Sequence, residues 1–328
     1  MKKNYYLTLD TETATLPFAD FIAQNEKQKK KIAIAKPLVY DIGWVITDRK
    51  GEILKKVNYL VQETFFVPQV FNTAYYRDKR PKYMQMLANG DITAKCWNDI
   101  IEELMNDLSV ATISTAYNAC FDYKKALPFT ENYIKALYSS NYQEWEDYQF
   151  AKCKDIVNGC DSSKNENYLE PYFEIRGKRF PICDLWAIAC ETMINTNGYK
   201  NYCLENELIS ASGLYFKTSA ETAFQYLTRN FDFIEDHTAL SDAEIESQIL
   251  TKVLQKRGVS PSLDCFPFQE LGYTTEYAVN KNSLKYMLTV KTGIENWLDN
   301  ANENTSFYQQ MLSKLAYMEY HIERVRGF

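Results

Sequence analysis

Two acidic motifs that lie far apart in the chain carry the residue types of a divalent-metal site. Asp10 and Glu12 belong to the stretch Asp10-Thr11-Glu12-Thr13, which directly follows an apolar run at residues 5–9. Asp242 closes the stretch that begins at His237, and a helical pattern of apolar residues follows it. Side chains in a strand alternate between its faces, so we expect Asp10 and Glu12 to point the same way where the first strand ends.

A third motif, Asn-Ala-Cys-Phe-Asp at residues 118–122, supplies another carboxylate at Asp122. Four carboxylates in one place would repel one another without cations, and carboxylate oxygens are the ligands that magnesium prefers. We therefore predict two Mg²⁺ or Mn²⁺ ions as cofactors, held by Asp10, Glu12, Asp122 and Asp242. Two such ions stabilise the attacking and leaving oxygens of an in-line displacement. This chemistry predicts hydrolysis of a phosphodiester.

His237 is one of only two histidines in the chain. An unperturbed histidine titrates near neutral pH, which suits a general base that activates water. The residue directly precedes the helical stretch that carries Asp242, so we expect it on a mobile loop that swings in when substrate binds. A glycosidase with paired carboxylates would need only two of the acids and no histidine at this spacing, which disfavours that alternative.

Apolar patterns predict the elements that position these motifs. Antiparallel strands are expected in the N-terminal part, at residues 4–9, 39–48 and 52–61. Beyond them the pattern predicts an amphipathic helix over 97–108, strands at 110–117 and 180–183, and helices at 184–195 and 239–256. Each of the three motifs lies at the end of one of these elements, where side chains from several elements can converge.

Two basic clusters allow two interpretations each. The first cluster lies between the first two strands and consists of Lys27, Lys29, Lys30 and Lys31. It belongs either to a solvated surface helix or to a basic flap over a phosphate backbone. The second cluster mixes cations with tyrosines: Tyr75, Tyr76, Arg77, Lys79, Arg80, Lys82 and Tyr83. It is suited to stacking on single-stranded bases, or it is a loop that packs through its tyrosines.

In their order and context, the three motifs resemble those of the DEDDh 3′–5′ exonucleases. This superfamily of polymerase proofreading subunits and oligoribonucleases has a ribonuclease H-like fold. The resemblance covers residues 4–256, and includes Asp41-Ile42-Gly43-Trp44 as the second strand and Cys183-Asp184-Leu185-Trp186 as a strand-to-helix step. The segment after Thr13 is longer than the family pattern and lacks its small glycine.

The resemblance implies specific roles for the motif residues. Asp10, Glu12 and Asp242 would ligate the catalytic metal. Asp122 would help to bind the second metal, and His237 would deprotonate the attacking water. The pocket for the terminal nucleotide would be lined or shaped by Thr11, Thr13, Ala14, Asn118 and Phe121. The product would be a nucleoside 5′-monophosphate released from a 3′ end.

The expected architecture is an α/β, ribonuclease H-like fold. It would have a mixed five-stranded sheet, with three antiparallel N-terminal strands followed by parallel ones, flanked by helices. We expect an exonuclease domain over residues 1–257, with insertions near 17–37 and 128–179. A mostly helical C-terminal extension would follow at 258–328, and its last amphipathic helix would pack internally, on a protein partner or on a second copy.

The expected substrates are single-stranded or frayed 3′ ends, with DNA favoured. The alternatives are an exoribonuclease of the same family, and a catalytically silent module that binds nucleic acid or assembles with other proteins. The net charge of −6 excludes a generally basic nucleic-acid binder, so contacts must be local or metal-assisted.

The remaining composition predicts a cytoplasmic protein without membrane contact. No apolar stretch approaches the length of a membrane span, and no leader is visible before the first strand. Eight cysteines lack the dense spacing of a disulfide scaffold. The pairs Cys153/Cys160 and Cys183/Cys190 are too widely spaced for a structural zinc site, which favours reduced, buried thiols.

Overall fold

The chain forms two compact units, which are described separately. The structure, a computed structural model, describes residues 4–160, 169–194, 196–209, 216–259 and 284–301, with single positions between 308 and 322. Unit 1 comprises Met1–Ile188 and Ile234–Pro267, and unit 2 comprises Ala189–Phe233 and Phe268–Phe328. The domain boundary expected after residue 257 stays a prediction, since most of the chain beyond it lies outside the described residues.

Unit 1 is built on a seven-stranded mixed sheet with the order β4-β3-β2-β1-β5-β7-β6. The strands are β1 (Tyr5–Ala14), β2 (Leu38–Asp48), β3 (Ile53–Val61), β4 (Thr93–Lys95), β5 (Ile113–Ala116), β6 (Tyr172–Ile175) and β7 (Lys178–Asp184). The first three are antiparallel, as expected. β5 runs parallel to β1, and β7 runs parallel to β5. The predicted α/β class with a mixed sheet is confirmed.

The prediction of five strands was wrong, because an extra strand lies at each edge of the sheet. β4 pairs in parallel with β3 and has only 3 residues, too few to show an alternating pattern. β6 forms an antiparallel hairpin with β7. It falls within residues 128–179, which the sequence predicted to be an insertion.

β1 also continues through the acidic motif instead of ending before it. It stays paired with β2, with Asp10 opposite Gly43 and Glu12 opposite Asp41, until the register shifts between Glu12 and Thr13. The expected end at residue 9 was wrong because the polar side chains do not interrupt the backbone ladder. A strand beside a fully buried neighbour keeps its backbone groups paired whatever its side chains are.

The inner strand β2 is covered on both faces, and residues 38–47 are all buried. Gly43 faces the start of α12 (Ala239–Lys256). The indole of the next residue, Trp44, points to the other face and donates to Asp107 of α6 (Trp97–Val110) at 2.8 Å. The helices α6 and α12, both predicted from their apolar spacing, therefore lie on opposite faces of the sheet.

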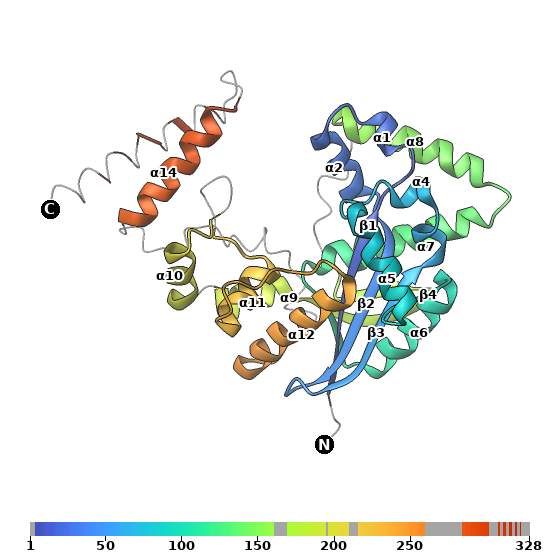
Figure 1. Ribbon diagram of the computed structural model, residues 1–328, viewed down its shortest axis with the longest axis horizontal. Coiled ribbons are helices and arrows are strands. Elements are labelled where there is room, and N and C mark those ends of the chain that lie inside the picture. Colours follow the sequence, from blue (N-terminus) through green and yellow to red (C-terminus); the bar gives the residue numbers. More distant parts are fainter. Residues whose placement is uncertain are drawn as a thin grey trace. The chain divides into compact units, whose positions relative to one another are not determined.

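The two segments that were read as insertions pack on each other. α1 (Ala19–Ile22) and α2 (Glu26–Ala35) come from the first, and both contact α8 (Tyr142–Asn158) of the second (Figure 1). The ring of Phe150 on α8 meets the ring of Phe18 at 5.4 Å and that of Phe21 at 6.5 Å. The side chain of Asn25 caps α2 by accepting the N–H of Gln28.

The other helical elements of unit 1 are mostly short connections. They are α3 (Gln62–Phe65), α4 (Pro68–Phe71), η1 (Arg77–Lys79), α5 (Arg80–Asn89), the π-helical η2 (Cys120–Ala126) and α7 (Leu127–Leu137). α9 (Leu185–Ala189) follows β7 and leads into unit 2.

Unit 2 contains η4 (Cys190–Ile194), α10 (Asn197–Glu205), α11 (Ala220–Thr228) and α14 (Leu284–Leu298). Ile294 of α14 packs with Met311 and Ile322, which belong to the predicted C-terminal amphipathic helix. Part of that apolar face is therefore covered within the unit itself, and a partner for it stays a prediction. The cysteines of the described ranges are free, and Cys183 and Cys190 are buried. Of the helices in these ranges, none has both the length and the apolar character to cross a membrane.

Candidate metal centre

Asp10 and Glu12 face α12. Residues paired across antiparallel strands point to the same face, and the partners of these two acids are Gly43 and Asp41. Gly43 lies against the backbone of α12, and the carboxylate of Asp41 accepts the N–H of Ala239, the first residue of α12, at 2.9 Å. The predicted alternation therefore brings Asp10 and Glu12 to the helix that carries Asp242.

The first turn of α12 is fixed by Asp41 and by the missing side chain of Gly43. A β-carbon at Gly43 would lie 2.3 Å from the backbone nitrogen of Leu240, so only glycine permits this approach. Asp41 is fully buried and also accepts the hydroxyl of Tyr83 at 2.8 Å. Burial raises the pKa of Asp41 to about 6, although these hydrogen bonds lower it.

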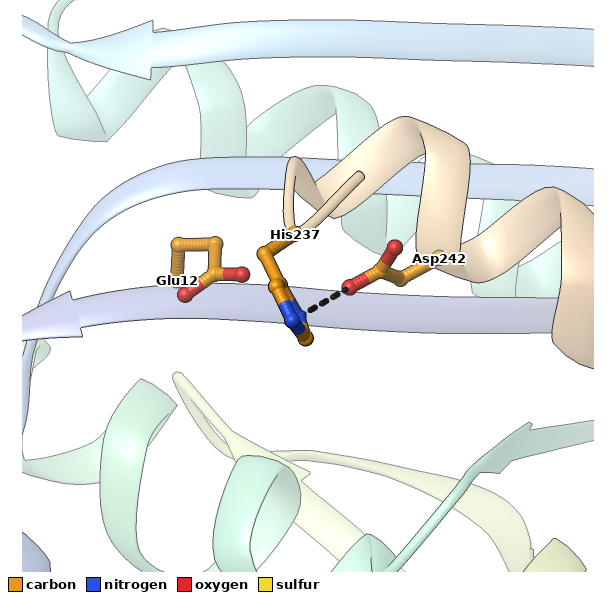
Figure 2. A group of neighbouring side chains, drawn as sticks. All are labelled: Glu12, His237 and Asp242. Atoms are coloured by element: carbon orange, nitrogen blue, oxygen red, sulfur yellow. Dashed lines mark ion pairs between the residues drawn. The ribbon is translucent and has the colours of Figure 1, made fainter. Parts of the chain in front are cut away.

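Glu12, His237 and Asp242 form a compact group (Figure 2). Each offers one ligand atom, and the three atoms lie within 4.8 Å of one another. Nδ1 of His237 lies 3.8 Å from a carboxylate oxygen of Asp242 and 3.8 Å from one of Glu235. Residues from the two ends of unit 1 in sequence thus meet, as the motifs predicted.

Asp122 joins from η2. Its carboxylate accepts the hydroxyl of Thr11 at 2.6 Å, and its side chain is almost fully buried. We expected an ordinary helix to begin at this motif, but the motif leads into a π-helical turn. Such turns are rare and occur frequently at functional sites. Asn118, which opens the motif, has the left-handed φ of 70°.

The acids raise one another's pKa. Burial raises the pKa of Asp10 well above its usual value, and the charges of Glu246, Asp122, Asp242 and Glu12 add to this effect. Burial and then Asp242 raise the pKa of Glu12, while Lys79 lowers it. Burial brings the pKa of Asp122 to about 7 and that of Asp242 to about 8. So much negative charge in one place calls for a cation.

Sequence reasoning missed Glu246 as a member of this group. It lies one helical turn after Asp242 and is buried, with one carboxylate oxygen accepting the backbone N–H of Tyr117 at 3.1 Å. It is the largest charged contributor to the raised pKa of Asp10. The signal was present, because residues four apart share a helix face.

Asp184 was also missed as a site residue. It ends β7, is buried, and accepts the backbone N–H groups of Asn118 at 3.3 Å and Trp186 at 3.0 Å. Burial raises its pKa to about 7. Its bond to Asn118 holds the start of the motif at residues 118–122, so Asp184 orients the segment that carries Asp122.

The loop that carries His237 is held by the second basic cluster. Lys79 donates to the backbone carbonyl of Asp236 at 2.5 Å and to that of His237 at 3.4 Å. Lys82 pairs with the carboxylate of Asp236. The imidazole stacks on the ring of Tyr76, with centroids 4.5 Å apart and planes 14° from parallel. These contacts place the histidine beside the acids, and its expected movement on substrate binding stays a prediction.

The donor atoms suit a hard divalent cation. Carboxylate oxygens dominate, and these are the ligands that Mg²⁺ and Mn²⁺ prefer. One carboxylate oxygen of Asp242, Oδ1, is buried and has no hydrogen-bond partner in the part of the chain that the structure describes. An orphaned buried oxygen among mutually repelling acids fits a metal ligand.

A groove of about 540 Å³ borders the acids, which we call the α2 groove. Of the residues predicted to contact the terminal nucleotide, Thr11, Thr13 and Phe121 line it, together with Glu12. Its other lining residues are Glu26, Lys29, Lys30, Ala33, Ile34, Thr73, Ala74, Tyr75, Tyr76 and Arg77. Ala14 is buried, and among the described residues neither it nor Asn118 belongs to this lining.

Comparison of this chain with known proteins found no matching family model, no matching curated protein and no matching solved structure.

Proposed function

We propose that this protein is a metal-dependent 3′–5′ exonuclease, which releases nucleoside 5′-monophosphates from the 3′ ends of nucleic acid, with DNA favoured. A ribonuclease H-like fold is part of the proposal. Supporting it are the inner strands of the sheet, of which β1, β2 and β3 are antiparallel and β5 and β7 are parallel to β1.

One observation carries the proposal: acids from three separate chain segments surround one place, and a histidine lies beside them. Glu12 and Asp242 lie with His237 in one group, and the charges of Asp122 and Asp242 act on Asp10. A structural role does not explain buried carboxylates that repel one another, since isolated buried charges destabilise a fold. Perturbed pKa values in such a cluster are typical of a reactive site.

The residues divide into metal holders and a base. Asp10, Glu12 and Asp242 would hold the catalytic ion, and Asp122 would help to hold a second. When bound, such ions stabilise negative charge on the attacking and leaving oxygens. His237 would accept the proton of the attacking water. The carboxylates of Glu235 and Asp242, each 3.8 Å from Nδ1, would stabilise the imidazolium that forms.

The direct test is digestion of end-labelled oligonucleotides with Mg²⁺ or Mn²⁺. A 5′-labelled single strand should shorten stepwise from its 3′ end, and a 3′-labelled one should release a labelled mononucleotide at once. Asp10→Asn should abolish both reactions, whereas Glu102→Gln, an exposed acid on α6, should leave them unchanged. Equal degradation by the wild type and Asp10→Asn would overturn the proposal.

The same assay separates the alternatives. DNA and RNA strands of one sequence, digested in parallel, distinguish a deoxyribonuclease from an exoribonuclease. If the wild type binds these strands but degrades neither with either ion, a silent module that binds nucleic acid replaces the proposed enzyme.

A further inference from the structure

Both basic clusters of the sequence reach the α2 groove. Lys29 and Lys30 come from α2. Arg77 comes from the start of η1, which is separated from α2 in sequence by β2 and β3. Glu12 lies in the same lining, so the groove runs from these cations to the acids. Two segments that are unrelated in sequence thus place positive charge beside one candidate reaction centre.

These cations are available to a ligand to different degrees. Lys30 is exposed and makes no ion pair within the described part of the chain. Arg77 is exposed, and its guanidinium donates one long bond of 3.5 Å to the carbonyl of Asn72. Lys29 is paired with Asp20 at 2.7 Å, and Glu26 adds one negative charge to the lining. Lys30 and Arg77 are therefore the better phosphate ligands.

Tyr75 presents an aromatic face in the same groove. Its side chain is 85% exposed, which is unusual for so large a ring, and it stands edge-on to Tyr76 at 4.9 Å. Tyr76 in turn stacks on His237. An exposed ring beside cations is the arrangement on which single-stranded bases stack, because every base has an aromatic face.

The wall formed by α2 is built before any ligand arrives. Asn25 caps the helix, Ile32 is fully buried beneath it, and α8 packs against it. A preformed wall lowers the entropy that a ligand must lose on binding. Because α8 belongs to the segment 128–179, this segment supports the groove through the contact between α8 and α2.

We propose that the α2 groove binds the single strand that leads to the 3′ end, with Lys30 and Arg77 on its phosphates and Tyr75 stacked on a base. The proposal rests on the proposed function and deepens it, because it makes single-stranded nucleic acid the substrate class. A volume of about 540 Å³ is that of a site for a small ligand. It suits the end of one strand, whereas a duplex needs a wider surface.

Binding is tested in the Asp10→Asn background, so that the strand stays intact. The double variant Lys30→Ala/Arg77→Ala is compared with Lys27→Ala/Lys31→Ala, which removes the same charge; its lysines belong to α2 but do not line the groove. Fluorescence anisotropy measures the affinity for a labelled single-stranded oligonucleotide in Ca²⁺ at several salt concentrations. The groove variant should bind roughly tenfold more weakly, and its salt slope should fall by about 1.4 for two lost phosphate contacts.

A second measurement uses the p-nitrophenyl ester of thymidine 5′-monophosphate, which has no preceding phosphates. In the active protein, the groove variant should lower the ratio of oligonucleotide turnover to ester turnover at least fivefold, and the control should not. Equal weakening by both double variants, or equal competition from a duplex or an acidic peptide, overturns the groove proposal. If the wild type hydrolyses neither substrate, the proposed function fails, and the anisotropy result still decides the groove.

Discussion

Gly43 of β2 lies directly against the backbone of Leu240 at the start of α12. Its strand partner is Asp10, so the point of closest approach between strand and helix lies beside the acid. Because Gly43 has no side chain, α12 can approach β2 closely, and this approach sets the distance between the motif of Asp10 and the motif of Asp242. The glycine matters here for space, not for an unusual backbone conformation.

Gly43→Ala should therefore damage the site more than the fold. The new β-carbon would lie 2.3 Å from the backbone nitrogen of Leu240, so α12 must move. We expect a loss of about 1–3 kcal/mol in the free energy of unfolding, as for other overpacked cores, and a larger relative loss of turnover. Thermal unfolding and nuclease assays measure the two effects. Gly258→Ala, with nothing within 4 Å of the new carbon, is the control.

His237→Asn should lower kcat by about 10²- to 10⁴-fold, which is the usual contribution of a general base. Asparagine suits the test because His237 has a φ of 47°, and asparagine tolerates left-handed backbone better than most residues. The melting temperature should stay close to that of the wild type, and added imidazole should restore part of the rate. A loss smaller than about fivefold would contradict the role of base.

Glu246→Gln should stabilise the protein without metal and weaken metal binding. Burial and neighbouring acids raise the pKa of Glu246 well above its usual value of 4.5, so its ionised form destabilises the fold at neutral pH. Glutamine can still accept the N–H of Tyr117. In EDTA at pH 7.5 the variant should melt at a higher temperature, and a Mn²⁺ titration should show lower affinity.

The matched control for this change is Glu244→Gln on the same helix. Glu244 is more exposed and pairs with Lys56 at 2.6 Å. Its loss should cost no more than about 1 kcal/mol, as for other surface ion pairs, and should leave the Mn²⁺ affinity unchanged. A Glu246→Gln protein that melts no higher than the wild type in EDTA would contradict the destabilising repulsion assigned to Glu246.

Stabilisation by a divalent cation should grow between pH 6 and pH 8. The pKa of Asp242 is raised from 3.8 to about 8 and that of Asp122 to about 7. A raised pKa in the folded state stabilises the fold below the unfolded pKa, and this contribution is lost as the pH rises through the folded value. A cation binds the ionised acids and displaces their protons.

Melting temperatures with saturating Mn²⁺ and with EDTA, measured at both pH values, test this linkage. The difference between the two should be larger at pH 8, and it should shrink at both pH values in Asp242→Asn. A difference that is equal at pH 6 and pH 8 would mean that these carboxylates are not the ligands.

The sequence predicted the strands and helices whose side-chain pattern is regular. β2 is a mostly apolar run, as expected of a strand buried on both faces, whereas α6 and the run that follows Asp242 show the helical period. β4 and β6 gave no such signal, because one is a short edge strand and the other lies among polar residues. With 3 and 4 residues, both edge strands are too short for a periodic pattern to stand out.

The candidate site was predictable only in part. The order of the motifs, each at the end of a regular element, predicted the acids and the histidine as site residues. Asp41 and Asp184 act through backbone N–H groups of distant residues, and no sequence pattern records such partners. The α2 groove depends on how two basic clusters fold toward each other, which the sequence left open between solvated surface and ligand contact.

Asp242 and His237 join unit 1 late, because α12 comes last among its described elements and residues 189–233 belong to the other unit. Chains fold from the N-terminus during synthesis, so every described strand of the sheet is made before His237 and Asp242. A nascent chain that stops before residue 234 contains these strands but lacks both residues. Under the proposed function, nuclease activity in a growing chain would begin only when α12 has emerged and joined the sheet.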